Sequence, residues 1–386
     1  MTDRMNRIYL DHAATTTVRP EAVAAMVPLL GGGYNPSSLH AEGRTARAAL
    51  DDARETVARV LGARPRESVF TGAGSEAVVL ALVGSARAQL DRGRLLLTSA
   101  IEHHAVMHAF DVLERDGWRV TRLGVDARGL VDPDDFARAL NPGTTVASVM
   151  LANNEIGVVQ PVAELAELAR ERGVVFHTDA VQAPGWLPLD VDALGVDLLS
   201  LSAHKFNGPK GVGVLYVRSG TPIEPLIVGG GQEHGLRSGT ENVSGIAGLA
   251  AALRLAEDER LDTAARVGDL RDRLEAGIRA AFPDAVVNGE GAPRLPNNLS
   301  VAFADLPSDA LLIRLDLEGI AASAGSACAA GSLEPSHVTA ALGLDERRRL
   351  GVIRFSLGRA TTAEEVDEVL RRLPLIVSDV RSPLPV

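Results

Sequence analysis

The sequence contains one cysteine, Cys328, among its 386 residues. A single thiol cannot form an intramolecular disulfide, and we therefore expect a reducing, cytoplasmic setting. The N-terminus lacks the apolar core of a signal peptide, so none is predicted. The longest apolar stretches, such as residues 245–253, are too short to cross a bilayer, so no membrane contact is predicted.

Aromatic and basic residues are also scarce. Phe, Trp and Tyr make up 3% of the chain, the formal net charge is −11, and no run of five basic residues occurs. Proteins that bind nucleic acids usually have basic patches, and those that bind single strands also stack bases on aromatic side chains. The sequence therefore predicts no direct contact with nucleic acid.

Short apolar runs alternate with amphipathic helical segments along most of the chain. Buried parallel strands are nearly continuous apolar runs, and helices between them cover the faces of the sheet. The sequence thus predicts an α/β fold, with a large domain at residues 16–260 around a mostly parallel central sheet flanked by helices. A smaller α+β domain is predicted from residues 1–15 and 261–386, because the pattern changes near residue 260. The runs predicted as strands include residues 94–99, 145–152, 173–180, 197–204 and 212–218.

Lys205 directly follows one of these runs. A lysine after a strand is most often an ordinary surface residue, but open α/β sheets bind ligands at the carboxyl ends of their strands, where a lysine can form a Schiff base. Asp179 ends the preceding run and Gln182 follows it. Pyridoxal 5′-phosphate (PLP) needs a carboxylate at its pyridinium nitrogen and a neutral donor near its phenolate oxygen. These three residues therefore indicate a PLP site.

A glycine-rich turn before a helical segment is a candidate phosphate site. Free N–H groups around Gly74 and Ser75, together with the helix dipole, would hold an anion, although an ordinary strand–turn–helix connection has the same pattern. The turn lacks the ending of a P-loop, and no G-x-G-x-x-G follows a strand. His103 and His104 follow another run and are candidates for stacking on a cofactor ring and moving protons, although a lone histidine is more often incidental.

Taken together, the motifs resemble one enzyme family, in their order and spacing, over nearly the whole chain. The family is the cysteine desulfurases, PLP enzymes of fold type I that supply sulfur for iron–sulfur clusters and other sulfur compounds. The stretches that resemble it are IYLDHAATT, YNPSSLH, IEHHAV, NNEIGVVQP, HTDAVQ, SAHKFNGPKGVG, RSGTENV, SAGSACAAGSLEPSHV and IRFSLGRATT.

The resemblance implies a role for each matching position. Lys205, His103 and Cys328 correspond to the catalytic residues, and Asn35 and Arg354 correspond to a clamp for the substrate carboxylate. Thr240 corresponds to a residue that reaches the phosphate of the neighbouring subunit, which implies a homodimer. No metal site is predicted. The implied cofactor-binding residues are Gly74, Ser75, Asn154, Asp179, Gln182, Ser202, His204, Lys205 and Thr240.

Cys328 lies in SAGSACAAGS, a segment of small residues only. A small buried thiol is one interpretation. The resemblance implies another, in which the Cys328 thiolate takes the sulfur of L-cysteine, L-alanine leaves, and the persulfide is carried to an acceptor such as an iron–sulfur scaffold protein. Small residues would give such a carrier its mobility. The length of the segment matches the long-loop subgroup of the family.

The phosphate turn departs from the family pattern. Where the family usually has SGATES[DN]N, this chain has GAGSEAVV, residues 72–79. Ser75 keeps a hydroxyl at the threonine position, whereas Gly72, Ala77, Val78 and Val79 replace polar residues. We expect the backbone contacts with a phosphate to survive, whereas the fate of the side-chain hydrogen bonds in this turn stays open.

Two alternatives remain at this point. Another PLP enzyme of the same fold, an aminotransferase or a selenocysteine lyase, would share the cofactor residues, because fold alone does not fix the reaction. A non-catalytic interaction protein could keep the fold without activity. Cys328 argues against an aminotransferase, and the intact set of Lys205, Asp179, His103 and Arg354 argues against an inactive scaffold. The recipient of the sulfur is left open, with iron–sulfur assembly as the leading hypothesis.

Overall fold

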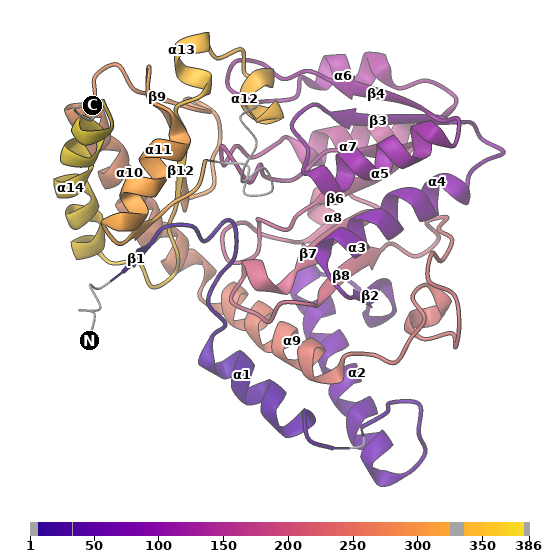
Figure 1. Ribbon diagram of the computed structural model, residues 1–386. Helices are drawn as coiled ribbons and strands as arrows, with labels where there is room; N and C mark the ends of the chain where they lie inside the picture. The colour runs from indigo at the N-terminus through magenta and orange to yellow at the C-terminus, as the bar shows by residue number, and fades with distance from the viewer. Residues whose placement is uncertain (1–6, 33, 325–335, 382–386) are drawn as a thin grey trace.

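A seven-stranded sheet forms the centre of the larger part of the molecule (Figure 1). The computed structural model describes residues 7–32, 34–324 and 336–381. Strand β8 runs antiparallel to both of its neighbours, and the other neighbouring strands are parallel. This mostly parallel sheet confirms the predicted α/β class. In spatial order the strands are β2 Ser68–Thr71, β8 Gly213–Val217, β7 Leu198–Ser202, β6 Val175–Asp179, β5 Thr144–Ser148, β3 Leu95–Ser99 and β4 Arg119–Leu123.

Two hydrophobic cores cover the two faces of this sheet. Successive side chains of a strand point to opposite faces, and accordingly Leu199 packs in one core whereas Leu198 packs in the other. The first core includes residues of α2, α6, α7 and α9, and the second includes residues of α3 and α5. Burial on both sides therefore explains the apolar runs of the inner strands, whereas the edge strand β4 is only partly buried.

The helices of this part alternate with the strands, as the sequence predicts. Helix α2, the longest of them, begins at Ala41 and ends at Leu61, where Gly62 takes the left-handed conformation (φ 65°) that favours glycine after a helix. The α-helices are α1 Pro20–Met26, α2 Ala41–Leu61, α3 Gly74–Val79, α4 Ser85–Arg87, α5 His104–Arg115, α6 Pro133–Ala139, α7 Val162–Glu171, α8 Val191–Leu194 and α9 Val243–Asp258. Short 3₁₀ or π turns are η1 Val27–Leu29, η2 Pro65–Glu67, η3 Leu80–Gly84, η4 Ala203–Lys205 and η5 Glu233–Gly235.

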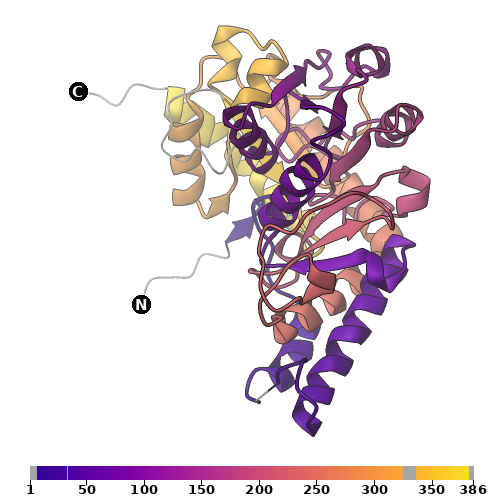
Figure 2. The same ribbon diagram turned by 90° about the vertical axis from the view of Figure 1, so that its right-hand side faces the viewer.

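A separate core lies in the C-terminal part, drawn in orange and yellow in Figures 1 and 2. A three-stranded antiparallel sheet, β12-β10-β9, packs there against α10, α11 and α14. Ile8 and Leu10 also pack in this core, and β1 pairs in parallel with β11. The elements are β1 Ile8–Tyr9, β9 Val286–Val287, β10 Asn298–Ala302, β11 Ile320–Ala321, β12 Val352–Ser356, α10 Arg260–Ala281, α11 Ser308–Leu317, α12 His337–Ala341, α13 Glu346–Arg349 and α14 Ala363–Arg381.

These separate cores support the predicted division of the chain between residues 15 and 16 and between residues 260 and 261. The division itself remains a proposal. The N-terminal segment belongs by its packing with the C-terminal core, although the rest of the chain separates them in sequence. Within the described ranges, every helix is too short or too polar to cross a lipid bilayer.

Candidate active site

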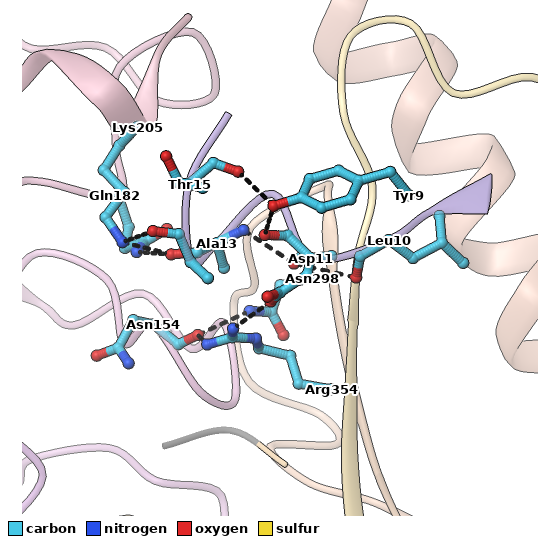
Figure 3. Close-up of polar contacts among 12 residues, drawn as sticks. Tyr9, Leu10, Asp11, Ala13, Thr15, Asn154, Gln182, Lys205, Asn298 and Arg354 are labelled. Carbon is cyan, nitrogen blue, oxygen red and sulfur yellow. Dashed lines mark hydrogen bonds and ion pairs between the residues drawn. The ribbon is translucent and has the colours of Figure 1, made fainter. Parts of the chain in front are cut away.

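A cavity of about 290 Å³ opens at the carboxyl ends of β6 and β7. Lys205 reaches it from η4, the turn that follows β7 directly. Its Nζ atom donates to the carbonyl oxygens of Ala13, at 2.6 Å, and Ala14, at 2.8 Å (Figure 3). The amine is thereby held at the cavity wall by the backbone of the N-terminal segment.

Asp179 is the last residue of β6 and lines the same cavity. Its Oδ1 atom accepts a hydrogen bond from the backbone N–H of Val181, at 3.0 Å. Burial raises the pKa of Asp179, while the nearby His103 and Lys205 act to lower it. A cationic group facing this carboxylate would favour its ionised form.

His177 lies two residues before Asp179 and is fully buried. Its ring nitrogens are 2.9 Å from the hydroxyls of Ser148 and Ser200 on the two neighbouring strands. Burial lowers the pKa of His177 to about 3, so the ring is neutral at physiological pH. This side chain links three strands beneath the carboxylate of Asp179.

The N-terminus of α3 forms another wall, where Gly74 and Ser75 line the cavity together with Ser202 and His204. A Cβ atom at position 74 would lie 2.8 Å from the Cβ of Ser202, so glycine allows a close approach of the turn to the end of β7. His204 Nδ1 is 3.1 Å from the hydroxyl of Thr15. The wall presents backbone N–H groups and hydroxyls, the donors that an anion needs.

His103 is the N-cap of α5, and its Nδ1 atom accepts a hydrogen bond from the N–H of Ala105 at 3.1 Å. The neutral ring therefore carries its proton on Nε2. Burial lowers the pKa of His103. His104 also lines the cavity and packs edge-on against His337, with ring centroids 4.9 Å apart.

Arg354 approaches the cavity from β12 in the C-terminal core, with 1% of its side chain exposed. Its guanidinium lies 2.7 Å from the Asp11 carboxylate and donates to the carbonyl oxygen of Asn154 at 2.8 Å (Figure 3). Gln182 Nε2 donates to the Ala13 carbonyl oxygen, at 3.0 Å. Residues from both parts of the chain thus meet at one site.

Two residues assigned by the resemblance, Asn35 and Thr240, lie elsewhere. Asn35 is exposed before α2, and its side chain accepts from the N–H of Ser37 at 2.9 Å. Thr240 is exposed on the loop before α9. Neither lines the cavity of its own chain, so the structure does not bring Asn35 together with Arg354 within one chain. Cys328 lies outside the described residues.

Several polar residues of the site did not emerge from the sequence pattern. Glu102 and Glu155 line the cavity, and burial raises the pKa of both carboxyls, that of Glu102 to about 8. His337 donates through Nε2 to the carbonyl oxygen of Glu102, at 2.8 Å. The signal that could have found them is the resemblance itself, because Glu102, Glu155 and His337 lie within the motifs IEHHAV, NNEIGVVQP and SAGSACAAGSLEPSHV.

The comparisons with known proteins decide the family. The family model described as aminotransferase class-V matches residues 8–369. This chain belongs to the class-V aminotransferase family. It is 46% identical to a cysteine desulfurase IscS of Dictyoglomus turgidum, over 97% of this chain and 95% of the relative. It is 45% identical to the cysteine desulfurase NifS of Azotobacter vinelandii, over 99% of this chain and 95% of the relative.

Solved structures agree with these relatives. A NifS-like protein superposes with a TM-score of 0.90 at 38% identity, covering 97% of this chain and 100% of its own. A structure titled SspA in complex with cysteine superposes with a TM-score of 0.81 at 36% identity, over 92% of this chain and 100% of its own. The resemblance to PLP-dependent cysteine desulfurases is confirmed.

The cavity of this member of the class-V aminotransferase family fits PLP. A buried carboxylate, an amine and a wall of N–H and hydroxyl donors surround one space, and these match the pyridinium, aldehyde and phosphate groups of the cofactor. Among the described residues, no cluster of three or more His, Cys, Asp or Glu side chains is arranged to hold a metal ion.

Proposed function

We propose that this enzyme converts L-cysteine to L-alanine and places the sulfur on Cys328 as a persulfide. The observation that carries the proposal is the convergence of Lys205, Asp179, His103 and Arg354 on one cavity. The overall change is balanced, because the Cys328 thiol and L-cysteine together contain the atoms of the persulfide and L-alanine. No external oxidant or reductant is needed for this step.

The residues of the cavity have distinct proposed tasks. Asp179, Gln182, Ser202, His204 and the turn at Gly74 and Ser75 would hold PLP, which supplies an electron sink for the Cα carbanion when it is bound. Asn154 is proposed to lie beside the cofactor phenolate.

The substrate is proposed to bind between the arginine and the lysine. The Arg354 guanidinium would bind the substrate carboxylate, since its planar fork matches that group. The Lys205 amine would remove the Cα proton, and His103 would move protons later through Nε2. The Cys328 thiolate would accept the sulfur.

We further propose that the working unit is a homodimer. Asn35 and Thr240 are exposed and lie away from their own cavity, as expected if each completes the site of a partner subunit. The segment before Asn35 also exposes large apolar side chains, with Val27 58% and Leu30 63% accessible. Sedimentation that shows a fully active monomer at assay concentration would contradict the dimer.

The proposed recipient of the persulfide sulfur is an iron–sulfur scaffold protein. The length of the segment around Cys328 supports this, as do the relatives named IscS and NifS. We also propose, on the same grounds, that the protein belongs to the long-loop subgroup of the family.

The test of the function is the stoichiometry of products from L-cysteine. Equal amounts of L-alanine and sulfide are expected with a thiol reductant. Without one, the outer sulfur of the persulfide is expected to pass to a thiol of a purified scaffold protein, which becomes a persulfide while Cys328 returns to a thiol. An aminotransferase would instead release a keto acid and no sulfide. A selenocysteine lyase would turn over L-selenocysteine and leave L-cysteine intact. Either result would overturn the proposal.

A further inference from the structure

Glu76 connects two segments near the proposed phosphate wall. It lies in the first turn of α3, immediately after Gly74 and Ser75. Its Oε2 atom accepts from the backbone N–H of Gly72 at 2.8 Å, and its Oε1 atom accepts from Arg237 Nε at 2.8 Å. One carboxylate therefore holds both the turn that enters α3 and the loop that contains Arg237.

The loop that contains Arg237 is itself firmly anchored. Glu233 is buried, where its carboxylate accepts from Arg54 at 2.7 and 2.9 Å and from the N–H of Phe70 in β2 at 2.8 Å. Glu233 and His234 both have positive φ angles, 47° and 59°, which non-glycine residues rarely adopt. Such strain persists only where surrounding contacts hold the backbone in place.

Gly72 lies close to both Glu76 and Arg237. A Cβ atom on Gly72 would lie 2.7 Å from Glu76 Oε2 and 3.5 Å from Arg237 Nη2. A larger residue at this position would require the Glu76 carboxylate to move. Gly72 is one of the positions where this chain departs from the family pattern, and its lack of a side chain leaves the space beside the Glu76 carboxylate open.

We propose that Glu76 and Arg237 form a positioning pair that couples the phosphate wall at Gly74 and Ser75 to the loop presenting Thr240. The inference rests on the proposed PLP site and dimer, and it adds that the turn at the phosphate wall and the loop presenting Thr240 stabilise each other. Contact of a partner subunit with the loop further stabilises the turn at Gly72, and a phosphate held at α3 stabilises the loop. Coupling between two sites is reciprocal, so a change at either member of the pair reaches both segments.

The experiment is a double-mutant cycle with Glu76→Gln, Arg237→Gln and the double variant. Amide hydrogen exchange is measured in the apoprotein over residues 71–77 and 229–242, and the rate of PLP release is measured in the holoenzyme. Glu114→Gln is the matched control, because Glu114 and Arg122 form a pair of similar exposure, at 2.7 Å, on α5 and β4. Each single variant is expected to speed exchange in both segments, and PLP release, by about fivefold.

The two members act as a unit if the double variant changes these rates no more than either single variant does. The control is expected to stay within about twofold of the wild type. The proposal is overturned if each variant loosens only its own segment, or if the effects in the double variant multiply. A wild-type protein that binds no PLP overturns the proposed function instead, while exchange in the apoprotein still reports on the coupling.

Discussion

The Arg354 guanidinium and the Asp11 carboxylate lie 2.7 Å apart at the wall of the cavity. An incoming substrate carboxylate would therefore meet an arginine whose charge is already balanced by an internal acid. Asp11 follows β1 and Arg354 lies in β12, so this relationship also joins the N-terminal segment to the C-terminal core. The pair holds the guanidinium in orientation before any ligand arrives.

Arg354→Lys should weaken substrate binding while preserving the fold. Lysine keeps the positive charge beside Asp11 but lacks the planar fork that binds a carboxylate through two hydrogen bonds. We expect the KM for L-cysteine to rise roughly 10- to 100-fold, because one hydrogen bond between charged groups is lost. Steady-state kinetics measure this change, with the more exposed Arg359→Lys as the control. An unchanged KM would refute the clamp.

Lys205→Ala should abolish covalent attachment of the cofactor. The lysine amine is the only proposed nucleophile for the PLP aldehyde, and we expect turnover to fall by at least about 10²-fold because the base for the Cα proton is also lost. Borohydride reduction followed by mass spectrometry of the peptide containing residue 205 measures the attachment. Lys210→Ala, in the same connection between β7 and β8, serves as the control. Wild-type labelling and turnover in Lys205→Ala would contradict the assignment.

Cys328→Ala should still bind PLP and L-cysteine but form almost no L-alanine. The expected loss lies in kcat rather than in substrate binding, because the variant lacks the sulfur acceptor but keeps the residues proposed to bind the substrate. Absorbance spectroscopy during mixing with L-cysteine follows binding, and amino-acid analysis follows the product. If the variant produces alanine at the wild-type rate, Cys328 is not the acceptor.

Acidification should destabilise the protein through buried His177. Its pKa is about 3 in the fold and about 6.5 when unfolded. Between these values the unfolded chain binds more protons than the native one, so the free energy of unfolding falls as pH falls. In His177→Asn we expect the slope of this free energy against pH, from pH 6.5 toward pH 3, to decrease by up to about 1.4 kcal/mol per pH unit.

Urea denaturation at a series of pH values measures that slope. The control is His108→Asn, which removes an exposed histidine at the surface rather than one buried in the central sheet. Equal slopes for His177→Asn and the wild type would show that the buried imidazole does not govern acid stability.

The sequence was sufficient to predict the sheet and the positions of several site residues. Lys205 follows one buried run and Asp179 ends the run before it. The carboxyl ends of neighbouring parallel strands meet at one edge of a sheet, so the proximity of the two residues follows from local pattern and topology. The resemblance then supplied the roles of residues such as Arg354, which no spacing argument connects with Lys205.

The sequence did not predict which charged side chains pair within and beside the site. Asp11 meets Arg354, and Glu76 meets Arg237, across long stretches of chain, and neither spacing nor propensity encodes which distant charges come together. The placement of Asn35 away from Arg354 was missed for the same reason, because the resemblance assigned both to one clamp without saying which subunit supplies each.

The pairing of β1 with β11 has a consequence for synthesis of the chain. Ile8 is made early, but its partner Ile320 is made only after the entire central sheet. Because domains fold largely as they leave the ribosome, the large sheet is free to form while the N-terminal strand still has no neighbour. The carbonyl oxygens of Ala13 and Ala14, which hold Lys205, lie a few residues after this strand. Arg354, which lines the same cavity, lies in β12 and is made later still. A ribosome stalled before that point therefore presents a folded sheet without a finished active site.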